Sequence, residues 1–364
     1  MAYTIRPLGS FSEMKYGKMP KKNIISDIGK YPIFSGYRVV GYCDECNIDE
    51  QQLIVVARGV GGTGDVKLTP GACYLTNLSI AVLVDESVAL KKYLYYYFLK
   101  NNLCYLDSGS AQSQITIGDL KNVEVPLPSL EIQRKIVSVL DAIDKKICNN
   151  SEINDNLQQQ AMALYTSMFL DNPALETTAG TLKDIADISM GQSPNGSSYN
   201  ENGNGEVFYQ GRAEFGYRFP TRRLYTTEPK RMAEAGDVLL SVRAPVGDLN
   251  VAYERCCIGR GLGAIHSRNR YQSFVLYTMF ALRPQLDVYN GEGTVFGSIN
   301  RNALNDMPID IPSEDAIAAF EAIARPMDDM IRSNYEENCR LQELRDSLLP
   351  RLMSGEIDVT DIDI

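Results

Sequence analysis

The chain has 364 residues, of which 44% are apolar, so it is long enough for more than one domain and apolar enough to form cores. Its apolar runs are far shorter than a membrane span, and the N-terminal residues lack an apolar signal region, which predicts neither membrane insertion nor export. Eight scattered cysteines favour a reducing cytoplasm over a disulfide scaffold.

The formal net charge of −10 does not exclude a nucleic-acid partner, because the acidic excess is local. Residues 1–128 carry 13 basic and 12 acidic side chains, and residues 177–312 carry 14 of each. Residues 129–176 hold 4 basic and 7 acidic side chains, and residues 313–364 hold 5 and 13. Two nearly neutral blocks therefore alternate with two acidic ones.

Each neutral block is predicted to be β-rich, with short apolar runs between Gly, Asn and Pro turns. "LKKYLYYYFLKNN" (90–102) and "YQSFVLYTMFAL" (271–282) are predicted short helices within them. Each acidic block begins with Pro then Ser, at Ser129 and Ser313, and this pair predicts a helix N-cap. The predicted divisions are the domain 1–128, a helix 129–170, a linker 171–180, the domain 181–312, a helix 313–353 and an acidic tail 354–364.

Both predicted long helices carry an apolar seam with alternating spacings of four and three residues, which is typical of coiled coils. The first seam contains Ile136, Leu140, Ile143, Ile147, Asn150, Asn154, Leu157, Ala161, Leu164 and Met168. The second contains Phe320, Ala324, Met327, Ile331, Asn334, Asn338, Leu341, Arg345, Leu348 and Leu352. Polar residues in such a seam fix register at a cost in stability, so we interpret the four asparagines as register residues rather than as a functional site.

The sequence is also duplicated. "GSAQSQITIGDLKNVEVPLPS" (109–129) and "GTVFGSINRNALNDMPIDIPS" (293–313) align without a gap at an offset of 184 residues. Cys73 and Cys257 share this offset, and Arg58 lies opposite Arg243 at 185. A period of this length indicates a duplicated domain rather than a solenoid, whose repeats are roughly 20–50 residues long.

Two β-rich blocks, each followed by a long heptad helix, resemble the specificity subunit of type I restriction–modification systems. The resemblance lies in the two repeated passages, in "GQSPNGSSYN" and "SVRAPVGDLN", and in the C-terminal "LRDSLLPRLMSGEIDV" (344–359). It implies an α+β fold with two target-recognition domains in pseudo-twofold arrangement, separated by two long antiparallel coiled-coil helices.

The resemblance further implies a non-catalytic, cytoplasmic DNA-binding subunit. Each domain would read one half of a split target on double-stranded DNA, and the helices would recruit two methyltransferase subunits, with restriction/translocase subunits completing the assembly. No cofactor is expected on this chain, and S-adenosylmethionine and ATP would belong to the partner subunits. The alternative is a coiled-coil scaffold or partner-binding module that does not read DNA.

Basic side chains are the candidate DNA contacts, because Lys and Arg neutralise phosphates and Arg also reads guanine. The alternative for each is a solvated surface or, for Arg58 and Arg243, a structural ion pair. Gln112 and Gln114 are added because Gln can pair with adenine. The complete candidate set is Lys15, Lys18, Lys21, Lys22, Arg58, Gln112, Gln114, Arg212, Arg218, Arg222, Arg223 and Arg243.

Three other motifs suggest chemistry that their context does not support. "GVGGTG" (59–64) matches a dinucleotide-binding loop, but no helical pattern follows it, so a plain turn or a turn near DNA is favoured. Cys43 and Cys46 form half of a zinc pattern and are otherwise free thiols. His266 is the one histidine, and we expect no catalytic role for it.

Overall fold

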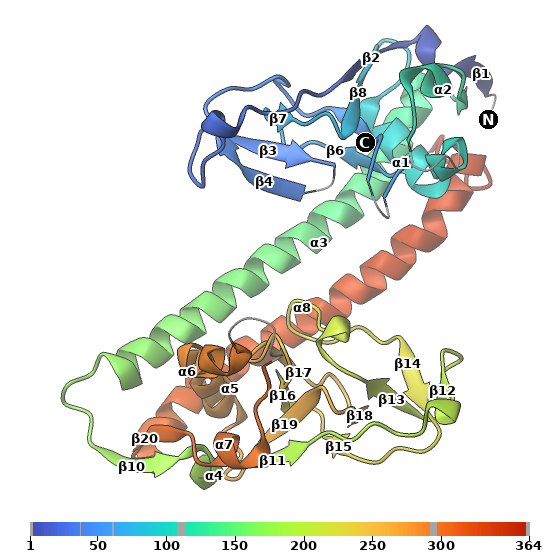
Figure 1. Ribbon diagram of the computed structural model, residues 1–364. Helices are drawn as coiled ribbons and strands as arrows, with labels where there is room; N and C mark the ends of the chain where they lie inside the picture. The colour runs from blue at the N-terminus through green and yellow to red at the C-terminus, as the bar shows by residue number, and fades with distance from the viewer. Residues whose placement is uncertain (1–2, 37, 60–61, 108–113, 292–296, 362–364) are drawn as a thin grey trace. The chain divides into compact units, whose positions relative to one another are not determined.

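The computed structural model of the chain describes residues 3–36, 38–59, 62–107, 114–291 and 297–361. It divides into two compact units: unit 1 combines Met1–Asn149 with Glu337–Ile364, and unit 2 is Asn150–Glu336. Each unit contains one β-rich region and part of two long helices, α3 (Leu130–Tyr165) and α8 (Glu314–Ser354) (Figure 1). The α+β class is confirmed.

Unit 1 is built on small sheets whose strand pairs are antiparallel except for one parallel pair within the three-stranded sheet. A four-stranded sheet has the order β2-β8-β5-β6, a three-stranded sheet has the order β4-β3-β7 with β3 and β7 parallel, and β1 pairs with β9. The strands are β1 (Thr4–Pro7), β2 (Ser12–Tyr16), β3 (Tyr31–Ser35), β4 (Arg38–Cys43), β5 (Leu53–Val56), β6 (Val66–Leu68), β7 (Tyr74–Leu75), β8 (Ser79–Val84) and β9 (Glu124–Leu127). The short helices are α1 (Lys91–Lys100) and α2 (Ile117–Lys121).

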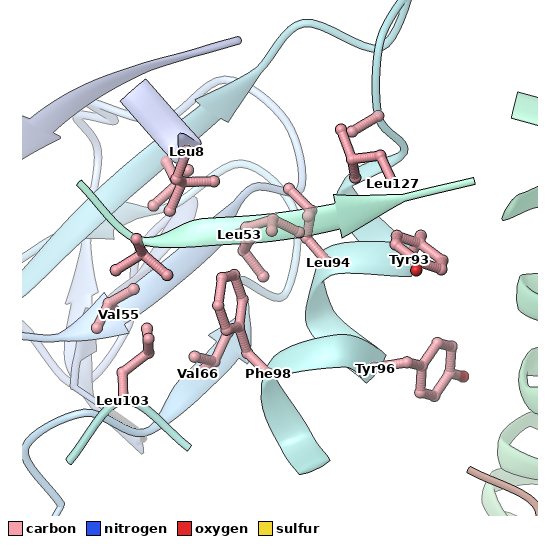
Figure 2. Packing of buried hydrophobic residues seen from close by; sticks show 14 of the residues in the cluster. Leu8, Leu53, Val55, Val66, Tyr93, Leu94, Tyr96, Phe98, Leu103 and Leu127 are labelled. Carbon is pink, nitrogen blue, oxygen red and sulfur yellow. The ribbon is translucent and has the colours of Figure 1, made fainter. Parts of the chain in front are cut away.

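The core of unit 1 lies between the four-stranded sheet and α1. Strand β5 is buried on both faces, and Figure 2 shows its Leu53 and Val55 close to Leu94 and Phe98 of α1. β-branched and aromatic residues suit such buried strands and helix faces. The predicted helix 90–102 is therefore confirmed as the element that covers this sheet.

Unit 2 repeats this plan with additional strands. Its four-stranded sheet has the order β11-β19-β16-β17, its second sheet has the order β12-β14-β13-β18-β15 with β13 and β18 parallel, and β10 pairs with β20. The strands are β10 (Thr177–Thr181), β11 (Ala186–Met190), β12 (Tyr199–Asn200), β13 (Glu206–Tyr209), β14 (Leu224–Thr226), β15 (Met232–Ala233), β16 (Val238–Ser241), β17 (Leu249–Val251), β18 (Cys256–Ile258), β19 (Leu262–Ser267) and β20 (Pro308–Pro312). The short helices are α4 (Leu182–Ile185), α5 (Gln272–Ala281), α6 (Arg283–Asp287) and α7 (Arg301–Asn305).

The sequence duplication reappears in the topology of the two units. Helices α2 and α7 begin 184 residues apart, at Ile117 and Arg301. In both units a strand near the start of the β-rich region pairs with the strand that leads into a long helix, β1 with β9 and β10 with β20. The predicted helix 271–282 is confirmed as α5, which corresponds to α1.

Helices α3 and α8 run antiparallel within each unit. In unit 1, Asn338 Nδ2 donates to the Ile147 carbonyl at 3.4 Å, and Arg345 pairs with Asp144 at 3.0 Å. In unit 2, Asn334 Nδ2 donates to Asn154 Oδ1 at 2.8 Å. Rising numbers on one helix thus meet falling numbers on the other, as an antiparallel pair requires.

The structure differs from the predicted linker and tail at both ends of the second repeat. The linker prediction 171–180 overlaps β10, whose residues 177–180 pair with β20, and α3 continues as a π-helical turn over Thr166–Leu170. The tail prediction 354–364 follows a charged composition, yet Val359 is fully buried in the core of unit 1 with Leu352 and Met353. The acidic composition of this segment gave no indication that Val359 belongs to the core of unit 1. No helix within the described ranges combines the length and apolarity that crossing a bilayer requires.

We predict that the buried tail residue stabilises unit 1. Val359→Ala should lower the free energy of unfolding by about 1–2 kcal/mol, because methyl groups are lost from a closed core. Asp361→Asn, an exposed change two residues away, is the matched control and should leave it unchanged. Chemical denaturation measures both. Equal stability of the two variants would mean that the tail does not contribute to the core.

We also predict that the buried Asn pair is coupled. Asn154→Leu alone leaves the Asn334 amide buried without its acceptor, which should cost about 1–3 kcal/mol. Replacing both residues with Leu should recover most of that loss, because an apolar seam then forms. A double-mutant cycle by denaturation measures the coupling. Losses that simply add in the double variant would show that the two amides do not depend on each other.

Candidate nucleic-acid interface

The basic loop of unit 2, residues 210–231, exposes three of its four candidate arginines. Arg212, Arg222 and Arg223 have side chains that are 49–58% exposed. Each also contacts a carboxylate: Arg212 Nε lies 2.6 Å from Asp248, Arg222 Nε 2.5 Å from Glu254, and a terminal nitrogen of Arg223 2.8 Å from Glu214. The hydrogen bond to Glu214 raises the pKa of Arg223 above its usual value. These arginines face solvent with part of their charge already balanced.

Arg218, the fourth candidate in this loop, is not a surface residue, so its prediction as a DNA contact is wrong. Its side chain is only 4% exposed and pairs with Asp328 of α8, while Nη1 donates to Gln158 of α3 at 3.1 Å. Burial raises the pKa of Asp328, and the neighbouring Arg218 charge opposes that rise. Sequence spacing alone could not separate this buried cation from its exposed neighbours.

The residues around Arg218 fasten the same loop to both long helices. Partial burial and the neighbouring carboxylate of Asp155 on α3 raise the pKa of Tyr217. The Phe219 ring lies 4.8 Å from that of Tyr335 on α8 and 5.8 Å from that of Tyr253. The loop is therefore held at its middle, with Arg212 before and Arg222 and Arg223 after the anchored segment.

Arg58 and Arg243 occupy the same backbone position in the two units. Arg58 forms an isolated antiparallel bridge with Gln114, and Arg243 forms one with Ser298. Both arginines are exposed, and neither has an ion-pair partner among the described residues, which weakens the alternative of a structural ion pair. Gln114 is half-buried beside Arg58, and Gln112 lies outside the described residues.

Apart from Arg58, the candidate cations of unit 1 are lysines, and they lie on a different part of the fold from the candidate arginines of unit 2. Lys15, Lys18, Lys21 and Lys22 are all exposed on β2 and the segment that follows it. Lys15 and Lys18 line a small groove with Asn47, and Lys15 Nζ lies 3.5 Å from the Asn47 carbonyl. None of these lysines forms an ion pair with a carboxylate that the structure describes. This arrangement suits contacts to phosphates, which carry no sequence information.

Two arginines that the sequence analysis missed lie beside Arg243. Arg260, in the turn between β18 and β19, and Arg301, the first residue of α7, line one groove with Arg243. Both are exposed. Arg301 follows "SIN" (298–300), which aligns with "QIT" (114–116), and it corresponds to Ile117 in the first copy, so comparison of the two copies could have singled it out.

The remaining sequence motifs are structural in this fold. Strand β6 follows the glycine-rich run, so no helix N-terminus is available for a pyrophosphate, and Gly64 turns tightly against Cys104 with φ +94°. Cys43 is buried and donates to the Glu45 carbonyl at 3.1 Å. Across the part of the chain that the structure describes, no three His, Cys, Asp or Glu side chains are placed to hold a metal ion. His266 Nδ1 lies 2.6 Å from Asp237, whose pKa burial raises.

Comparisons with known proteins agree with this fold and this duplication. Residues 2–159 and 176–345 match the type I restriction modification DNA specificity domain. A Methanocaldococcus jannaschii protein named as the MjaX specificity subunit of a type I restriction enzyme is 31% identical over 310 residues, which are 78% of this chain and 72% of that protein. The MjaIX specificity subunit of the same organism is 23% identical over 79% of this chain and 74% of that protein. The crystal structure of a type I restriction–modification S subunit from M. genitalium has the same fold, with a TM-score of 0.65 at 18% identity over 97% of this chain and 96% of that one.

We predict that Arg218 stabilises unit 2. Arg218→Ala leaves Asp328 buried without its counter-ion and should lower the free energy of unfolding by about 3–5 kcal/mol. Arg268→Ala is the matched control, since its ion pair with Asp187 is exposed and worth less than about 1 kcal/mol. Thermal or chemical unfolding compares them. An Arg218 variant that keeps wild-type stability would return Arg218 to the set of DNA contacts.

Proposed function

Because the chain belongs to the specificity-subunit family of type I restriction–modification systems, we propose that each of its two β-rich regions reads one half of a bipartite DNA target. Members of this family are the non-catalytic subunits that carry DNA target recognition. The proposal assigns a role to each part of the chain. Residues 1–128 read one half-site, residues 181–312 read the other, and the helices set the number of base pairs between the half-sites.

One observation carries this proposal. An exposed arginine sits on an equivalent backbone bridge in each copy, Arg58 opposite Gln114 and Arg243 opposite Ser298, while the basic side chains around it differ between the copies. An arginine at the same position in both copies is expected if both copies face DNA. Different basic side chains around it are expected if the two copies read different half-sites. The alternative scaffold function requires no such pair of exposed, uncompensated arginines.

The long helices offer a surface for the methyltransferase subunits. Most large apolar side chains on α3 and α8 face the seam, but four are about half exposed: Ile153, Ile323, Met330 and Leu344 are 46%, 47%, 51% and 46% exposed. Ile323 and Met330 are seven residues apart and so lie on one helix face. Apolar side chains that are exposed together on one helix face support a protein interface there. We infer that two methyltransferase subunits bind these helices and bring S-adenosylmethionine, and that restriction subunits bring ATP.

We predict that the readers can be exchanged independently. Replacing residues 181–312 with those of another family member should change one half of the methylated motif and leave the other half and the gap unchanged. Methylome sequencing of cells that carry the chimera and its methyltransferase detects the motif directly. The matched control replaces residues 1–128 and should change the opposite half. A chimera that changes only the gap, or wild-type cells with no split motif, would contradict the proposed function and favour the scaffold.

A further inference from the structure

The arginines of unit 2 fall into two groups by their neighbours. Six arginines, of which five are exposed and Arg283 is half-buried, contact a carboxylate in the structure: Arg212, Arg222, Arg223, Arg255, Arg268 and Arg283. Six other exposed arginines form no ion pair with a carboxylate that the structure describes: Arg231, Arg243, Arg260, Arg270, Arg301 and Arg325. An ion-paired arginine must give up that partner before it can bind a new anion, whereas an uncompensated one need not.

Three of these six, Arg243, Arg260 and Arg301, line a single open groove, whereas Arg270 and Arg325 line another groove together with Glu321, Asp328 and Asp329. Ser298 and Asn300 complete the polar lining of the first groove, and Val242 and Ile299 form its apolar floor. Of the described residues that line the groove, none is Asp or Glu. Three like charges on one concave surface raise its positive potential and favour an anionic ligand with several charges.

Hydrogen bonds fix the backbone that carries each of these arginines. The Arg260 N–H donates to Ser193 Oγ at 3.2 Å, and the next residue, Gly261, donates to the Gln210 carbonyl at 3.2 Å. On the other side, Ala244 N–H donates to Gly297 O at 3.0 Å and Ile299 N–H to Val242 O at 3.1 Å. Asn300 then caps α7 by accepting from Ala303 N–H at 3.0 Å, which places Arg301. The three side chains therefore start from fixed points, which reduces the entropy lost on binding.

The groove is not duplicated in unit 1. Arg58 corresponds to Arg243, but the turn between β7 and β8 contains Thr76, Asn77 and Leu78 where the second copy has Arg260. Ile117 stands where the second copy has Arg301. The lysines of unit 1 lie instead on β2 and after it. The two copies therefore present different sets of cations at their surfaces.

We propose that Arg243, Arg260 and Arg301 form a binding site for the phosphodiester backbone that flanks the half-site of the second copy. This assignment rests on the proposed function and names the chemistry of one part of it. Because backbone phosphates are the same in every sequence, these arginines set the affinity and orientation of the second reader rather than its base preference. Other side chains within 181–312 would contact the bases.

The experiment uses the chain copurified with its methyltransferase subunits and a duplex that contains its target. Arg260→Gln and Arg301→Gln should each weaken binding about fivefold at 0.15 M salt and reduce the slope of log affinity against log salt by about 0.9. The loss should be the same on targets that carry base changes in either half-site. Arg268→Gln removes an exposed but ion-paired arginine of unit 2, and this variant should bind as the wild type does.

Arg260→Lys and Arg301→Lys separate phosphate contacts from base reading. Lysine keeps the positive charge but cannot form the bidentate contact to guanine, so a phosphate site should retain most of its affinity. Lysine variants that lose binding and relax preference at one base pair would overturn the phosphate assignment. Gln variants with wild-type affinity and salt slope would also overturn it, while target-specific binding by the wild type would leave the proposed function intact. A wild-type complex that does not prefer its methylated target would overturn both.

Discussion

In each unit, an aspartate on a long helix accepts a hydrogen bond from a tyrosine of the β-rich region. This hydrogen bond attaches the β-rich region to the helix, and the rest of the structure depends on it. Tyr96 of α1 donates to Asp144 of α3 at 2.7 Å, and Tyr277 of α5 donates to Asp328 of α8 at 3.1 Å. The two aspartates are 184 residues apart, so the bond is part of the duplication. A β-rich region that could turn on its helix would not present its basic side chains at a constant place, and this partly buried hydrogen bond restricts that rotation.

The two copies satisfy the same carboxylate with arginines from different places. Asp144 pairs with Arg345 of the opposite helix, whereas Asp328 pairs with Arg218 of the basic loop. Each choice explains one anomaly of the sequence: Arg345 interrupts the second heptad seam, and Arg218 is a charged residue inside a docked loop. After the duplication, the aspartate of each copy thus kept an arginine as its counter-ion, and only the element that supplies this arginine changed.

Periodicity and duplication made the architecture predictable, whereas side-chain partners could not be read from one sequence. The heptad spacing of residues such as Ile136 and Phe320 depends on local repetition. Because the pattern occurs in both copies, each structural prediction is supported by two independent stretches of sequence. Whether a basic residue is exposed depends on contacts between distant segments, as for Arg218 with Asp328, 110 residues further on. The acidic residues around Val359 likewise predicted an exposed tail, whereas Val359 is buried, because burial depends on the folded unit and not on the local composition.

The same distinction reconciles an acidic chain with a DNA partner. Thirty-six basic side chains cannot all serve an anionic ligand when forty-six acidic ones compete for them, and many arginines of unit 2 are already bound to carboxylates. What matters for binding is the local field of the few cations that have no carboxylate nearby, because screening in water confines the influence of distant charges to about 8–10 Å. A protein can therefore carry a large negative charge on its helices and still offer a positive groove to a phosphate backbone.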